Sequence, residues 1–144
     1  MTSKREGGAL VSKVHQLSGR AFARILKAHG LDELNPAQGR ILYALWREDE
    51  ISQAELAART KLEKSTLTLM LDRLEKQGQI ERRPDPSDAR RRLVCTTEKN
   101  RALHGAYEAA SAEMLERFYR NLEDAEIDAF ERTLKKILAN LEEA

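Results

Sequence analysis

The sequence predicts a mainly α-helical fold of the α+β class, in which one short β-hairpin interrupts a series of helices. Apolar residues recur at steps of three and four over most of the 144-residue chain, which is the periodicity of amphipathic helices. Charged residues make up 34% of the chain, as expected for helices with well-solvated faces. Strand-like segments occur only on either side of a turn rich in Pro and Asp.

Two helices are expected in the first third of the chain. The first spans about 8–28, and Gly30 is placed to cap its C-terminal end. The second begins at Asn35 and Pro36, because Asn is a good N-cap and Pro is tolerated at the first helical position. Its apolar residues continue to about Arg47.

The next helical start is the best marked in the sequence. Ser52 and Glu55 have the spacing of a capping box, which predicts a short helix that ends near 59–60. After a tight turn, another helix is expected over about 64–77, and Gly78 ends it.

A β-hairpin is expected after this helix. Its predicted strands span 79–83 and 92–96, and they are joined by the loop 84–89, which is dense in turn residues.

A long helix follows, capped by Thr96 or Thr97 and reaching to about Leu122, and a last helix carries an apolar stripe over 127–141.

This order predicts a winged helix-turn-helix domain with a two-stranded wing over residues 35–97. The flanking segments, 1–34 and 98–144, carry apolar stripes that are long for a chain of this size. Such stripes need each other or a second subunit to cover them, so we expect N- and C-terminal dimerisation helices.

Composition excludes several classes of protein. No apolar run is long enough to span a membrane, and the N-terminal segment does not have the pattern of a signal peptide, so a cytoplasmic protein is expected. The single cysteine, Cys95, excludes an internal disulfide and a multi-cysteine metal site. We find no phosphate-binding glycine loop and no nucleophile with a base at motif spacing, so neither an enzyme nor a metal or cofactor is expected.

The outer face of the helix over 64–77 is a candidate for reading DNA. Leu67 and Leu71 belong to its buried stripe, whereas the hydroxyl residues at its start face outward and can donate to phosphates or base edges. Ser and Thr are also common at ordinary helix starts. What favours a recognition helix here is that these residues follow a capped helix and a tight turn. Leu69 lies opposite the buried stripe, where it either contacts a thymine methyl group or is an ordinary exposed leucine.

Arginines are concentrated in the hairpin. Residues 82–92 contain five arginines and two aspartates. Long cationic side chains at a hairpin tip can enter a narrow minor groove, although a solvated turn would have the same composition. We expect Arg90 to contact the groove and Arg91 or Arg92 to contact phosphates, while Asp88 braces an arginine of the domain.

The middle of the chain resembles the MarR family of bacterial and archaeal transcriptional regulators, in Ser52–Ala57, Lys64–Thr68, Asp72–Gly78, Arg82 and Asp85–Arg90. The resemblance implies a homodimer that reads a palindromic operator, with recognition helices in major grooves and wing arginines in minor grooves. It also implies a regulator that acts as a repressor. The candidate DNA-contacting residues are Ser52, Gln53, Lys61, Lys64, Ser65, Thr66, Thr68, Leu69, Arg73, Arg90, Arg91 and Arg92, and Asp88 matches the bracing aspartate.

The family also implies release from DNA by a small aromatic or phenolic acid, bound between the dimerisation helices and the DNA-reading part. The candidate contacts are His15, Arg20, Arg40, Tyr43 and Trp46, although residues of these types on an amphipathic helix more often have a purely structural role. Thiol-based sensing is not expected, because Cys95 lies in a predicted strand and no N-terminal cysteine is present.

A protein-interaction scaffold without DNA binding is the alternative, because winged domains also serve that role. Salt distinguishes the two functions: binding to duplex DNA weakens steeply with added salt when phosphates are contacted.

Overall fold

The mainly helical fold with a small sheet is confirmed. The computed structural model describes residues 4–142. Its elements in chain order are α1 (Gly7–Ala28), α2 (Pro36–Arg47), β1 (Ile51–Ser52), α3 (Gln53–Thr60), α4 (Lys64–Lys76), β2 (Ile80–Asp85), β3 (Asp88–Thr96), α5 (Glu98–Ala102), α6 (His104–Phe118) and α7 (Asp124–Glu142).

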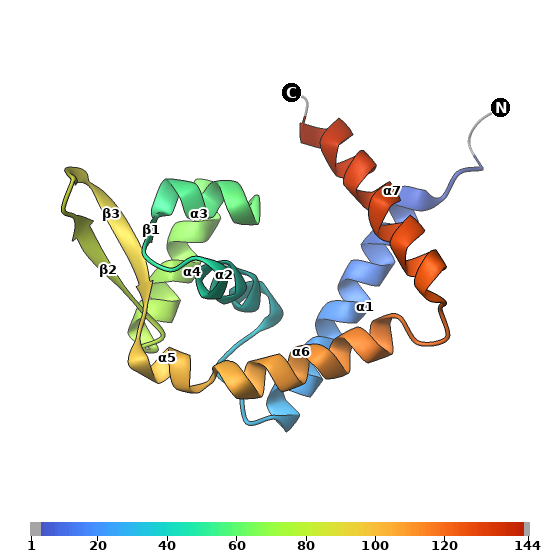
Figure 1. The fold of residues 1–144 in the computed structure, drawn as a ribbon, viewed down its shortest axis with the longest axis horizontal. Coiled ribbons are helices and arrows are strands. Elements are labelled where there is room, and N and C mark those ends of the chain that lie inside the picture. Colours follow the sequence, from blue (N-terminus) through green and yellow to red (C-terminus); the bar gives the residue numbers. More distant parts are fainter. Residues whose placement is uncertain (1–3, 143–144) are drawn as a thin grey trace.

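The elements form two parts that α6 connects (Figure 1). The winged domain, comprising α2 to β3, lies at one end of the molecule, and α1 and α7 lie at the other. Helix α6 runs between these parts and packs against α1. The hairpin of the winged domain therefore lies at the end of the molecule that is far from α1 and α7.

Local capping explains where the helices of the winged domain begin. Asn35 accepts a hydrogen bond from the backbone N–H of Gln38 (2.8 Å), and the Gln38 side chain accepts one from the backbone N–H of Asn35 (3.2 Å). This is a complete capping box. Ser52 caps α3 by accepting from the Glu55 N–H (3.1 Å), but the Glu55 carboxylate turns to Arg59 (3.0 Å). Only the first half of the capping box expected at Ser52 forms, because the Glu55 side chain pairs with Arg59 along the helix.

The core of the winged domain is aliphatic. Side chains from α2, α3, α4 and the sheet, together with Leu26 at the end of α1, are fully buried in one cluster. The members with no exposed surface include Leu26, Ile41, Leu42, Leu45, Leu56, Leu67, Leu71, Leu74 and Val94. Burial of each such side chain stabilises the fold by about 1.5–3 kcal/mol, and together they fix the angle of α4.

The hairpin is longer and its turn is tighter than the sequence suggested. Strands β2 and β3 extend into the predicted loop 84–89, which leaves Pro86 and Ser87 as the turn. The Asp85 carboxylate closes this turn by accepting from the Ser87 N–H (2.9 Å) and hydroxyl (2.8 Å). Pro84 fits into β2 because β2 is an edge strand of the sheet, whose order is β1-β3-β2. The third strand, β1, was not expected.

The prediction of one continuous long helix after the hairpin is wrong. Thr97 caps a short helix, α5, and the chain breaks at Leu103 before α6, which ends at Phe118, so Leu122 lies beyond it. Asn100 in α5 explains the break, because its side chain is held by Trp46 (2.8 Å) and Gln79 (2.8 Å) of the winged domain. Helix α5 thus belongs to the winged domain, and α6 starts in a new direction.

Across residues 4–142, no helix combines the length and the apolar composition that crossing a bilayer requires. Over the same residues, no group of three His, Cys, Asp or Glu side chains is arranged to hold a metal ion.

Packing of α2 against α6 predicts a destabilising substitution. A Cβ atom at Gly39 would overlap the Tyr107 hydroxyl oxygen and lie 3.0 Å from its Cζ atom. Tyr107 cannot yield easily, because its ring packs against Phe22 and Trp46 with centroids 5.8 and 4.8 Å away. We expect Gly39→Ala to lower the free energy of unfolding in urea by about 1–3 kcal/mol, as overpacking does, despite the better helix propensity of Ala.

The matched control is the same substitution in a Tyr107→Phe background, which lacks the overlapping oxygen. There the cost of Gly39→Ala should fall by at least half. An equal cost in both backgrounds would assign the effect to something other than this contact.

Candidate nucleic-acid interface

Helix α4 separates a buried face from an exposed one. Leu67, Leu71 and Leu74 are fully buried, whereas Leu69 is 71% exposed. Ser65, Thr66 and Arg73 are exposed as well. The exposed face offers hydroxyl groups, cations and one large apolar side chain, which are groups that contact phosphates and base edges.

The Thr68 hydroxyl is committed within the domain. It donates to the Lys64 carbonyl (2.8 Å) and accepts a hydrogen bond from the Gln53 side-chain amide (3.0 Å). Gln53 is the first residue of α3, so this pair of bonds fixes the start of α3 against α4. The turn between the helices contains Lys61 in the left-handed conformation (φ 59°). Thr68 therefore orients α3 and Gln53, and its hydroxyl has less capacity left for DNA than that of Ser65.

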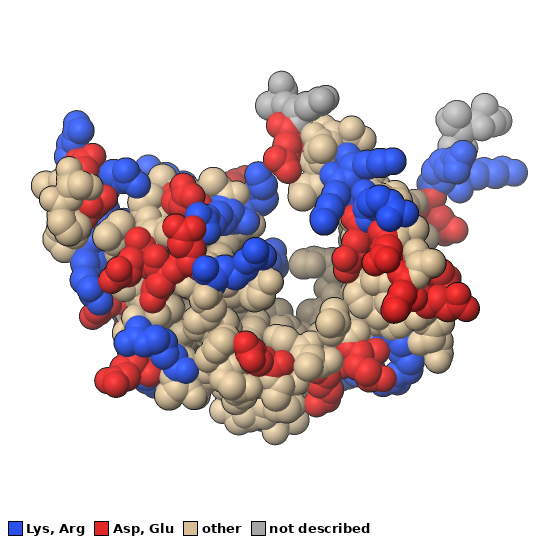
Figure 2. Space-filling model, viewed as in Figure 1, with Lys and Arg blue, Asp and Glu red and all other residues tan. Residues whose placement is uncertain are grey.

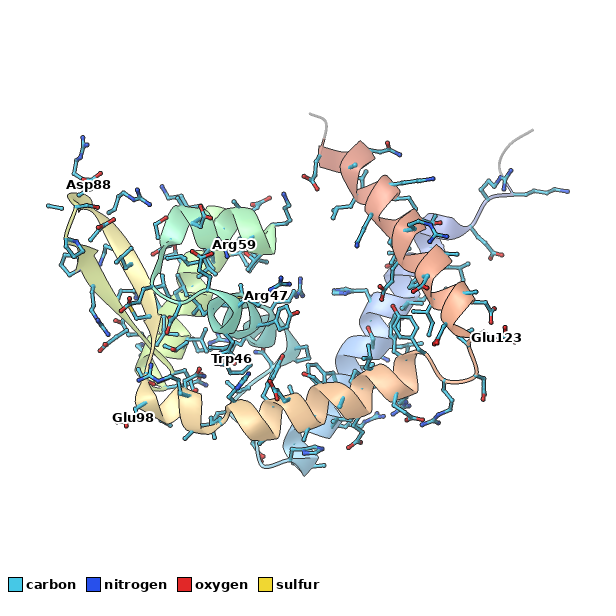
Figure 3. All side chains as sticks on the ribbon, in the orientation of Figure 1. Trp46, Arg47, Arg59, Asp88, Glu98 and Glu123 are labelled. Atoms are coloured by element: carbon cyan, nitrogen blue, oxygen red, sulfur yellow. The ribbon has the colours of Figure 1, made fainter. Side chains whose placement is uncertain are left out.

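Arg90 extends from the wing near its tip. Its side chain is 92% exposed, and Asp88, which Figure 3 labels at the tip, is mostly covered. The Asp88 carboxylate accepts from the backbone N–H of Arg90 (3.0 Å) and lies 3.4 Å from its Nε atom. Asp88 thus restrains the arginine that extends furthest into solvent.

The other wing arginines are placed by strand alternation. Arg92 pairs with Pro84 and lies on the same face of β3 as Arg90, and Arg91 lies on the opposite face. Arg91 Nε is 3.9 Å from the Asp85 carboxylate, and Arg92 donates to the Arg82 carbonyl oxygen (3.5 Å). Figure 2 shows Lys and Arg side chains at the tip and along the outer edge of the wing.

A concave surface brings the two helices and the wing together. It has a volume of about 450 Å³ and is lined by Ser52, Gln53, Ala54, Ala57, Lys64, Arg90, Arg91 and Arg92. Six of these eight residues are among the candidates taken from the sequence. Lys61, Ser65, Thr66, Thr68, Leu69 and Arg73 do not line it and lie on α4 or the turn before it. The start of α4 and the arginines of the wing therefore open onto the same concavity.

Ion pairs leave part of the positive charge free. Lys61 pairs with Glu142 at the end of α7 (3.2 Å). Over residues 4–142, Lys64, Arg73 and Arg92 form no ion pair within 4 Å, so their charges are available to a polyanion.

One functional arrangement was missed from the sequence. Arg82 of β2 is held between Asp72 and Glu75 of α4. The two acids lie three residues apart on one helix face, and this spacing was a signal that they share a partner.

A second concavity lies between α1, α2 and α6. It has a volume of about 390 Å³ and is lined by His15, Ser18, Gly19, Phe22, Pro36, Arg40, Ser111, Met114, Leu115, Phe118 and Tyr119. Of the five effector candidates, it contains His15 and Arg40. Tyr43 and Trp46 line a neighbouring concavity with Arg47, His104, Tyr107, Glu108 and Ser111, of about 450 Å³. Arg20 is exposed on α1 and lines neither.

Two tyrosines beside these concavities remain neutral at physiological pH. Burial raises the pKa of Tyr107 to about 12. Burial and a hydrogen bond to Glu131 (2.6 Å) raise the pKa of Tyr119 to about 12. A bound anion would therefore meet no phenolate.

Cys95 lies in the interior of the sheet. It is 1% exposed, and burial raises the pKa of its thiol. Both effects lower its reactivity.

Comparisons with known proteins agree with this geometry. A model of the MarR family matches residues 34–91. The chain is 38% identical over 87 residues to the HTH-type transcriptional regulator TtmR of Methylorubrum extorquens, which is 60% of this chain but only 43% of that relative. It is 30% identical to the multiple antibiotic resistance protein MarR of Escherichia coli over 91% of this chain and 90% of that protein.

A similar solved structure is a cysteine-to-serine mutant of E. coli MarR in complex with operator DNA. It aligns with a TM-score of 0.83 at 30% identity, over 91% of this chain and 92% of that one.

Proposed function

Because this chain belongs to the MarR family of transcription regulators, we propose that it binds a palindromic duplex as a homodimer and represses transcription there. It is a regulator and not an enzyme. A protein bound to a promoter excludes other proteins from the DNA that it covers, so repression needs no further contact. With duplex DNA as its partner, we propose that it acts in the cytoplasm.

The observation that carries the proposal is the shared concavity of α3, α4 and the wing. Lys64 at the start of α4 and Arg90 of β3 line it together. In this arrangement α4 enters a major groove with Ser65, Thr66 and Leu69, and Arg90 reaches the adjacent minor groove. Lys64, Arg73, Arg91 and Arg92 supply phosphate contacts in this proposal, and Lys61 joins them only by leaving Glu142. Ser52 and Gln53 lie at the start of the neighbouring helix.

We expect Arg90→Ala to weaken binding to duplexes that the wild-type protein selects from a random pool. The loss should be about tenfold or more, as for the removal of one groove contact worth 1–3 kcal/mol. Fluorescence anisotropy over a range of salt concentrations measures both the affinity and its salt dependence.

Arg83→Ala is the matched control, because Arg83 belongs to the same wing but pairs with Glu81 (2.6 Å) and Glu50 (3.6 Å). Its affinity should stay within about twofold of wild type. Equal affinities of the Arg90→Ala variant and wild type would remove the wing from the proposal. Failure to select any duplex, or binding indifferent to salt, would favour the protein-interaction scaffold.

The terminal helices support a homodimer. Their exposed apolar side chains include Leu10, Val11, Val14 and Leu17 of α1 and Phe130, Ile137, Leu138 and Leu141 of α7, with exposed fractions between 38% and 77%. An apolar surface of this extent on neighbouring helices is the mark of an interface. In the proposed dimer, the sequence-predicted segments 1–34 and 98–144 supply the contacts except for α5, which stays with the DNA-reading residues 35–97.

We expect wild type to be a dimer at micromolar concentration by light scattering and Leu17→Asp to be largely monomeric. Leu17 is 61% exposed in the single chain, so the substitution places a charge in the interface and not in the core. Leu69→Asp is the control, because Leu69 is also well exposed (71%) but lies on α4. A monomeric wild type would overturn the proposed assembly, and so would a Leu17→Asp variant that stays dimeric.

We further propose that the concavity between α1, α2 and α6 binds a small aromatic acid that releases the DNA. Arg40 and His15 offer positive charge or hydrogen bonds to a carboxylate, beside the rings of Phe22 and Phe118. The concavity joins helices of both parts of the molecule, so its occupant can change how the parts are spaced.

For this site we expect benzoate to bind wild type, and Arg40→Ala to abolish the heat of binding in calorimetry. Arg20→Ala is the matched control, since it removes the same charge outside the concavity. Retained binding in Arg40→Ala, or equal loss in both variants, would contradict the site.

A further inference from the structure

Arg82 is the most enclosed arginine among the ion pairs of the wing. Its side chain is 15% exposed, compared with 53% for Arg83 and Arg91 and 92% for Arg90. An arginine is rarely buried to this degree unless its charge is paired.

The partners of Arg82 are two carboxylates of α4. Its Nη2 atom lies 2.6 Å from Asp72 Oδ1 and 2.7 Å from Glu75 Oε1, and its Nε atom lies 3.2 Å from the same Glu75 oxygen. The backbone N–H of Arg82 also donates to the other Glu75 oxygen (3.3 Å). The hydrogen bond to Arg82 lowers the pKa of the Glu75 carboxyl, so the pair is ionised at neutral pH. A planar guanidinium held by several bonds has a fixed orientation.

The contacts of Arg82 with Asp72 and Glu75 connect α4 to the wing, because Arg82 lies on β2. It pairs with Val94 across the hairpin and lies two residues before Pro84, which is opposite Arg92. Its carbonyl oxygen accepts a bond from the Arg92 side chain (3.5 Å). The chain itself joins α4 to β2 only through residues 77–79, where Gly78 has a φ of 74°. The covalent link is a turn, and the side chain of Arg82 adds ion pairs between β2 and α4 beyond this turn and the apolar core.

We propose that Arg82 is a positioning residue that holds the wing at a fixed angle to α4 through Asp72 and Glu75. This inference rests on the proposed function. The angle sets the distance between the groove that α4 reads and the groove that Arg90 enters. Arg82 also neutralises Asp72, whose carboxylate is half exposed on α4 and would otherwise repel phosphates.

Arg82→Lys separates the positioning of the wing from the neutralisation of Asp72. Lysine keeps the positive charge near Asp72 but loses the fork that contacts both acids at once. We expect it to weaken binding to the selected duplex about fivefold to tenfold. The matched control, Arg83→Lys, should leave the affinity unchanged. Wild-type affinity of Arg82→Lys would overturn the positioning role and leave only neutralisation.

Combining the Arg82 and Arg90 substitutions tests the positioning role more directly than the single variant does. If Arg82 acts by placing the wing, its effect depends on the groove contact that the wing makes. In an Arg90→Ala background, Arg82→Lys should therefore reduce affinity by less than twofold. A full fivefold to tenfold loss in that background would show that the two residues act independently and would overturn the inference.

Hydrogen exchange of the free protein tests the same restraint without DNA. Arg82→Lys should accelerate exchange of the amides in residues 84–92, and leave α6 and α7 unchanged. Glu75→Gln provides a second variant with the same expectation. If wild type selects no duplex, the proposed function fails, but exchange still decides whether Arg82 restrains the wing. Unaltered exchange in both variants would overturn it.

Discussion

Burial of one face of α4 is the constraint on which the candidate interface depends. Leu67, Leu71 and Leu74 have no exposed surface, and they pack into a cluster that also contains Leu56 of α3 and Val94 of β3. This packing leaves α4 with a single orientation, in which Ser65, Leu69 and Arg73 face outward. The same cluster holds α3 and the base of the wing, so the apolar core determines which polar groups converge.

A buried chain of hydrogen bonds joins this core to the rest of the molecule. The Trp46 indole donates to Asn100, and the Asn100 amide donates to Gln79. These residues come from α2, α5 and the turn before β2, so one amide side chain ties three elements together. Among the described side chains, Gln79 Nε2 is buried without a partner.

Local signals were sufficient for most of the helices. Asn35 and Pro36 mark the start of α2, and Gly78 marks the end of α4, because caps depend on residues a few positions apart. Features that depend on distant partners were not accessible. The break at Leu103 follows from the contact of Asn100 with Trp46, 54 positions away. The sequence indicated Lys64 and Arg90 as candidates, and the family resemblance implied that their elements read neighbouring grooves. The concavity that they line together required the fold, and the proposed role of Arg82 required its distances to Asp72 and Glu75.

Trp46 has a consequence beyond its structural role. It is the single tryptophan of the chain, and it lies where the winged domain meets α6, with His104 at 4.7 Å between ring centroids (Figure 3). Indole emission depends on the polarity and the quenching groups of its surroundings. A change at the junction between the winged domain and α6 would alter those surroundings directly. The fluorescence of Trp46 therefore reports on how the two parts of the protein are arranged.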